Sequence, residues 1–90
     1  MRVTVLLFAR LRELAGESEY QCDVQAGATV ADVWHEAVAR HPAFEPFKGV
    51  VSCAVNEEFA RLGVAVSAGD VVAFLPPVSG GAPSSLAASR

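Results

Sequence analysis

The stretch Val71-Val72-Ala73-Phe74-Leu75-Pro76-Pro77-Val78-Ser79-Gly80-Gly81, near the C-terminus, decides the fold that we predict for this chain. Its first five residues are all apolar and follow the turn signal Ser67-Ala68-Gly69-Asp70, which predicts a central strand buried on both faces. The two prolines end sheet pairing because proline has no backbone N–H to donate to a neighbouring strand. We therefore expect the chain to leave the sheet after Leu75.

The residues that follow this strand predict a stiff and narrow arm. Consecutive prolines favour an extended polyproline II path, and two glycines without Cβ atoms fit a slot too narrow for other residues. Six residues span up to roughly 20 Å at ~3.3 Å each, which is long enough to enter a pocket of another protein. The arm consists of Pro76, Pro77, Val78, Ser79 and Gly80, and it ends at Gly81.

Size and composition predict one domain with a single modest core, since the chain has 90 residues and is 52% hydrophobic. No apolar run approaches the ~20 residues of a membrane span. Arg10, Arg12 and Glu13 stand where a secretion signal has small cleavage-site residues, so we expect a cytoplasmic location. The net charge of -3, with seven scattered Lys and Arg, argues against nucleic acid as a partner.

The N-terminal part of the chain predicts two paired strands. Residues 3–9 form an apolar run typical of a central strand. Residues 10–16 contain two leucines three apart and end in glycine, which predicts about one helical turn that stops at Gly16. Residues 19–24 alternate polar and apolar side chains, as in an edge strand paired with the first.

The middle of the chain predicts one main helix. Thr29 and Asp32 form a capping box, and the helix should stop before Pro42. On its outer side Glu36 and Arg40 are spaced for a weak i,i+4 ion pair. The apolar stripe consists of Val30, Val33, Trp34, Ala37, Val38 and His41.

Two further strands complete the predicted sheet. Residues 50–55 form one, and the turn Asn56-Glu57 leads into a short strand around residues 58–62. One helix then packs on one face of a mixed sheet of about five strands. The predicted fold class is therefore α+β, a β-grasp (ubiquitin-like) roll over residues 1–75.

Cysteine and histidine usage offers no metal site. Cys22 and Cys53 lie in separate predicted strands, and we interpret them as reduced packing residues, although one disulfide is possible. Two cysteines are too few for a plant-type iron–sulfur centre. His35 and His41 are six residues apart, which favours one solvent-facing and one helix-terminal histidine.

Three stretches together carry a family resemblance. They are Leu7-Phe8-Ala9-Arg10-Leu11-Arg12-Glu13-Leu14-Ala15-Gly16, Ala54-Val55-Asn56-Glu57 and the segment 69–81. A lone Gly-Gly is usually a flexible turn, but here it follows Pro-Pro-Val-Ser after an apolar strand. In this order and spacing the chain resembles the MoaD-like sulfur carriers, the small subunits of molybdopterin synthase.

The resemblance implies a chemistry at the carboxylate of Gly81 and no catalytic residue in this chain. In the family, an E1-like (MoeB-type) enzyme uses ATP and magnesium to adenylate that carboxylate, and a sulfur donor converts it to a thiocarboxylate. The arm then enters the MoaE-type large synthase subunit, where the sulfur passes to a pterin precursor of the molybdenum cofactor to build its dithiolene. The carrier itself is expected to bind no cofactor and no metal.

Docking to these partners needs an exposed surface. We expect Phe8, Phe59 and Leu75, with Arg12 at the rim, to form an apolar patch on the sheet face that the helix leaves open. The alternative is that the 44–62 region covers these side chains.

A C-terminal extension departs from the family pattern. Residues 82–90 are mostly small and polar, so we expect them to be disordered, and they leave Gly81 in a peptide bond without a free carboxylate. Either a protease cleaves the Gly81–Ala82 bond, or the extension is not part of the natural chain, or the protein is not an active carrier. We favour proteolytic maturation.

Two other functions stay open. The same chemistry serves carriers for thiazole or amino-acid synthesis, and ubiquitin-like modifiers joined through Gly81 to lysines. A β-grasp interaction domain that never carries sulfur is the third possibility, because one fold serves many functions.

Overall fold

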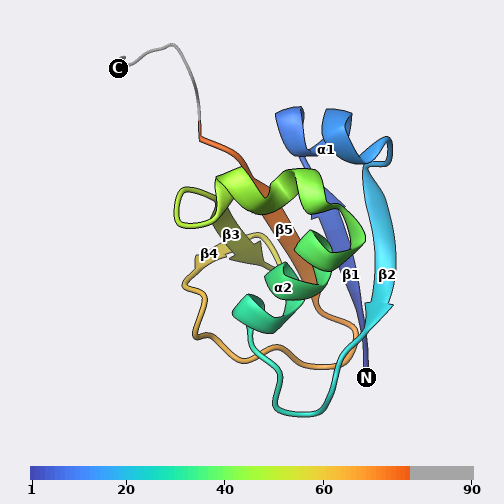
Figure 1. The fold of residues 1–90 in the computed structure, drawn as a ribbon. Helices are drawn as coiled ribbons and strands as arrows, with labels where there is room; N and C mark the ends of the chain where they lie inside the picture. Colours follow the sequence, from blue (N-terminus) through green and yellow to red (C-terminus); the bar gives the residue numbers. More distant parts are fainter. Residues whose placement is uncertain (78–90) are drawn as a thin grey trace.

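The computed structural model describes residues 1–77, in which five strands form one sheet with a helix across one face (Figure 1). The predicted arm residues 78–81 and the extension 82–90 lie outside the described residues. No helix in the described part is long and apolar enough to cross a membrane. The elements are β1 (Arg2–Leu7), α1 (Ala9–Ala15), β2 (Glu19–Asp23), α2 (Val30–Arg40), the 3₁₀ helix η1 (Pro42–Phe47), β3 (Ser52–Val55), β4 (Glu58–Ala60) and β5 (Val71–Leu75).

The sheet has the order β2-β1-β5-β3-β4, with β5 at its centre. β5 runs parallel to β1 and antiparallel to β3, and the two outer pairs are antiparallel. Phe74 lies opposite Leu7 on one side and Cys53 on the other. The predicted mixed β-grasp sheet with a central C-terminal strand is confirmed.

The capping box of α2 is present as predicted. The Thr29 side chain accepts a hydrogen bond from the Asp32 amide, and the Asp32 carboxylate accepts one from the Thr29 amide at 2.8 Å. The backbone N–H of Val30 donates to the carbonyl of Val64, and the backbone N–H of Ala31 donates to the carbonyl of Leu62, both at 2.9 Å. The segment after β4 therefore supplies acceptors for amides of the first helical turn, which have no partner within the helix. Its carbonyls face α2, and β4 ends at Ala60 and not near residue 62 as predicted.

The core lies between α2 and one face of the sheet. Trp34 on α2 meets Phe74 of β5 edge-on, with 5.0 Å between ring centroids, and stacks on Phe44 of η1 at 5.8 Å. The buried positions on α2 are Val30, Val33, Trp34 and Ala37, which are four of the six positions of the predicted stripe.

Burial of β5 on both faces is a prediction that the structure contradicts. Val72 and Phe74 are fully buried, whereas Val71, Ala73 and Leu75 are only partly buried. The reason is that the helices α2 and η1 lie on the same side of the sheet, and in the described residues no helix lies across the other side (Figure 1). One face of this central strand is therefore available to a partner.

Candidate functional site

A hollow of about 600 Å³ lies on the face of the sheet that α2 leaves open. We call it the open-face hollow. Strands β1, β5 and β3 supply its floor, and the β3–β4 turn and β4 supply one wall. Its lining residues are Leu6, Phe8, Ala54, Asn56, Glu57, Phe59, Val71, Ala73 and Leu75.

The predicted docking residues Phe8, Phe59 and Leu75 are brought together in this hollow. Phe8 follows β1 in an extended conformation, so alternation turns its side chain away from the buried face, and it is 41% exposed. Phe59 is 82% exposed, and Leu75 is partly buried. Within residues 1–77 the lining does not include Arg12, which is exposed on α1.

The alternative that the 44–62 region covers this patch does not match the geometry. Phe44 is fully buried against Trp34 on the opposite face of the sheet. Phe59 belongs to the same region but lines the hollow and does not fill it. The apolar patch is therefore exposed, and its use for docking stays a prediction.

Asn56 fixes one wall of the hollow, a role that sequence reasoning missed. Asn56 and Glu57 have positive φ angles of 51° and 73°, as in the tight turns that join two strands. The side-chain nitrogen of Asn56 donates to the Asp70 carboxylate at 3.0 Å, and the side-chain oxygen of Asn56 accepts a hydrogen bond from the backbone N–H of Val71 at 3.0 Å. The turn is thus tied to the start of β5. The sequence predicts both the Asn56-Glu57 turn and the Gly69-Asp70 turn. That the two turns are in contact can be seen only in the folded structure.

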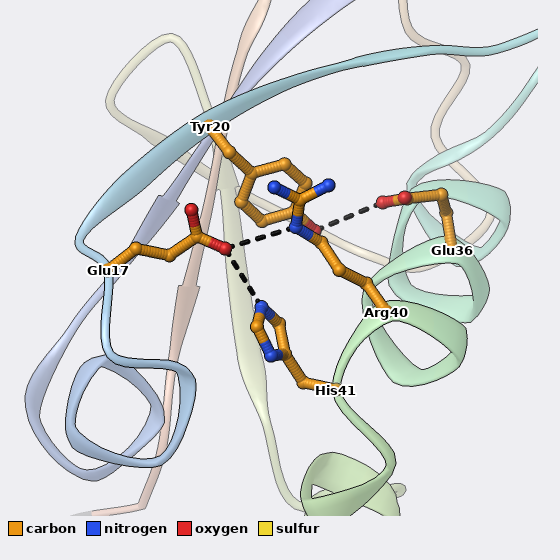
Figure 2. A network of polar contacts seen from close by, with 5 residues as sticks. All are labelled: Glu17, Tyr20, Glu36, Arg40 and His41. Carbon is orange, nitrogen blue, oxygen red and sulfur yellow. Dashed lines mark hydrogen bonds and ion pairs between the residues drawn. The ribbon is translucent and has the colours of Figure 1, made fainter.

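A polar network ties β2 and the turn before it to the C-terminal end of α2 (Figure 2). Arg40 Nε donates to the Glu17 carboxylate at 3.0 Å, and His41 Nε2 lies 2.9 Å from the same oxygen. The Tyr20 hydroxyl donates to Glu36 at 3.0 Å, and the Arg40 guanidinium lies 4.1 Å from the centre of the Tyr20 ring. The predicted Glu36–Arg40 ion pair is wrong, because each side chain has a partner outside the helix.

This network stabilises the fold and does not form an acid–base site. Burial, together with the negative charge of Glu36, raises the pKa of Tyr20, so the phenol stays protonated. The Arg40 hydrogen bond, followed by the contact with His41, lowers the pKa of Glu17 despite some desolvation, so the carboxylate stays ionised. Neither group is poised to exchange a proton near neutral pH.

Glu17→Gln is expected to lower the melting temperature more at pH 7 than at pH 3. A carboxylate whose pKa is lowered on folding from its ordinary value of 4.5 stabilises the protein above that value, and the stabilisation is lost as the pH falls through the folded-state pKa. Thermal unfolding of both proteins at the two pH values measures this. Glu13→Gln, which removes the exposed pair with Arg10, is the control. An equal loss at both pH values would contradict the assignment.

The two cysteines are free and buried, as predicted. Burial raises the pKa of the Cys22 thiol to about 11, with a smaller contribution from Glu36, and burial also raises the pKa of Cys53. Since the thiolate is the reactive form, neither residue suits sulfur transfer at neutral pH. Among residues 1–77 no three His, Cys, Asp or Glu side chains gather as metal ligands would.

Comparisons with known proteins agree with the predicted fold, and the family match extends to residue 81. The family model described as the ThiS family matches residues 5–81. The molybdopterin synthase sulfur carrier subunit of Arabidopsis thaliana is 36% identical over 81 residues, which cover 90% of this chain and 84% of that protein. The small archaeal modifier protein 1 of Haloferax volcanii is 41% identical over 83 residues, covering 83% of this chain and 95% of that protein.

Solved structures show the same fold. The crystal structure of SAMP1 from Haloferax volcanii has a TM-score of 0.82 at 38% identity and covers 90% of this chain and 100% of that chain. The crystal structure of the Amycolatopsis orientalis BexX/CysO complex has a TM-score of 0.66 at 29% identity and covers 88% of this chain and 99% of that chain. The resemblance to MoaD-like, ubiquitin-like carriers is confirmed, and the protein belongs to the ThiS family.

Proposed function

We propose that this protein is the sulfur carrier subunit of a molybdopterin synthase and carries sulfur as a thiocarboxylate on Gly81 after residues 82–90 are removed. The observation that carries the proposal is the position of Leu75. This residue ends β5, lines the open-face hollow and is followed at once by Pro76. A partner that covers the hollow would therefore lie where the arm leaves the sheet. The family match, which extends to residue 81, supports the same arm.

The chemistry at Gly81 needs groups that partners supply. An oxygen of the free carboxylate attacks the α-phosphorus of ATP in an E1-like, MoeB-type enzyme, and pyrophosphate leaves. Hydrosulfide, HS⁻, delivered by a sulfur donor then attacks the acyl carbon, and AMP leaves with the bonding electrons. Loss of the sulfur-bound proton to solvent gives the thiocarboxylate. Magnesium and ATP belong to the activating enzyme, and the acceptor subunit is of the MoaE type. This chain contributes reach, a narrow terminus and a docking surface, and it acts in the cytoplasm without catalysing a step itself.

Phe8→Asp tests the docking surface. A carboxylate buried against an apolar partner without a counter-charge is strongly unfavourable, so binding to the large subunit should weaken at least about tenfold. Isothermal titration calorimetry with the protein ending at Gly81 measures the affinity, and sulfur transfer should fall in parallel. Since Phe8 is already 41% exposed, the fold should persist. Val50→Asp is the matched control, because Val50 is 52% exposed and does not line the hollow.

Unchanged affinity in Phe8→Asp, with the control also unchanged, would show that partners do not use this hollow.

A protein modifier joined through Gly81 to lysines is the second candidate. The observation in its favour is the 41% identity to a relative named as a small archaeal modifier protein. Recovery of peptides with Gly81 in an isopeptide bond would favour this function, and thiocarboxylate without such peptides would favour the carrier. An interaction domain that never carries sulfur would show neither.

A further inference from the structure

Strand β4 is an edge of the sheet whose outer side has no partner among residues 1–77. The two-residue turn Asn56-Glu57 joins it to β3, and its closing pair is Val55 and Glu58. In such a turn the backbone N–H of Glu58 points toward β3. Because N–H and C=O directions alternate along a strand, those of Phe59 point outward, away from β3.

We propose that β4 pairs with β4 of a second copy of this chain, antiparallel, with Phe59 opposite Phe59. Two residues that face each other in an antiparallel ladder exchange both N–H···O bonds when their backbone groups point toward the partner strand. Phe59 is the middle residue of the three-residue strand and the one whose groups point outward. The two-fold axis therefore passes between the two Phe59 residues, and the two five-stranded sheets become one continuous sheet.

Charges favour this register over its neighbour. Glu57, in the turn before β4, and Arg61, just after it, flank the strand on either side of Phe59. An antiparallel arrangement about Phe59 brings the end of β4 that carries Glu57 in one copy beside the end that carries Arg61 in the other, twice by symmetry. Both side chains are exposed, and neither forms an ion pair within the described residues. A register centred on Glu58 would instead place two carboxylates opposite each other, which is destabilising.

Burial of apolar surface also favours the pairing of the two β4 strands. Phe59 is 82% exposed and lies on the open face of the sheet, beside Ala54 in the hollow. Pairing brings the two aromatic rings together across the axis and removes part of their surface from water. Since Phe59 also lines the open-face hollow, the second copy and a partner docked on the hollow compete for this side chain. The pairing itself does not depend on the proposed sulfur chemistry.

A charge swap tests the pairing with the full 90-residue chain. Sedimentation velocity from ~10 μM to ~1 mM at low salt should show a monomer–dimer equilibrium, because an interface this small is weak. Arg61→Glu or Glu57→Arg alone should lower the association constant about tenfold, since each change replaces two attractive charge pairs at the ends of the paired strands by two repulsive ones. The double variant Glu57→Arg with Arg61→Glu should restore it. Arg10→Glu, an equal charge change on α1, should leave it unchanged.

Nuclear magnetic resonance gives a readout for the register. On dilution the Phe59 and Arg61 amide signals should shift, while those of the other edge strand, β2, should not. A monomer at ~1 mM, or a double variant as weak as the single variants, would overturn the proposal. Matching thermal unfolding curves for all four variants would show that these results do not come from misfolding.

Discussion

Protein that ends at Gly81 is expected to form an acyl-adenylate with ATP and the E1-like enzyme of the same organism, whereas the 90-residue chain is expected to form none. In the full chain the Gly81 carbonyl belongs to an amide bond to Ala82, so no carboxylate oxygen can attack ATP at this residue. ATP–pyrophosphate exchange measures this reaction. Exchange should occur with the protein that ends at Gly81 and be absent with the 90-residue chain. The variant Gly81→Ala that also ends at residue 81 is the matched control, because it has a free carboxylate and the same length but a methyl group on its last Cα.

The control separates the need for a free carboxylate from the need for a terminal residue without a side chain. If the terminal slot admits only bare backbone, Gly81→Ala protein that ends at residue 81 should be adenylated far more slowly than the unchanged protein of the same length. Equal exchange by the 90-residue chain and the trimmed protein would remove any need for proteolysis. No exchange by either would argue against a carrier.

Phe74→Ala is expected to lower the free energy of unfolding by about 3–5 kcal/mol, a large part of the roughly 5–15 kcal/mol that stabilises a domain. Phe74 is fully buried in the central strand, with its ring 5.0 Å from that of Trp34. Leu75→Ala, one residue later on the partly exposed face, should cost only about 1 kcal/mol. Urea unfolding measures both. Equal losses would mean that the two faces of β5 are buried alike.

Local signals in the sequence were sufficient for most of the fold. The Thr29–Asp32 capping box, the stop at Gly16 and the alternation in residues 19–24 depend on neighbours within four residues, and all three appear as predicted. The apolar run 71–75 was placed correctly at the centre of the sheet. Its second face was misjudged because composition cannot show which face a single helix covers.

Contacts between distant segments account for what sequence reasoning missed. Glu36 and Arg40 fit an i,i+4 pair by spacing, but the fold brings Glu17 to Arg40 from 23 residues away. Asn56 and Asp70, which are joined by a hydrogen bond, are likewise 14 residues apart in the sequence. Three of the predicted docking residues, Phe8, Phe59 and Leu75, do line one hollow on the open face, because alternation along a strand assigns faces without knowledge of the partner strands. Their use for docking stays a prediction. Arg12, predicted at the rim of the patch, does not line the hollow within residues 1–77.

An intact mass spectrum of this protein from its native cells tests most directly whether Gly81 is the sulfur-carrying terminus. The proposed function predicts a species that ends at Gly81, with a fraction in which one carboxylate oxygen is replaced by sulfur. A spectrum that contains only chains ending at Arg90 would contradict it.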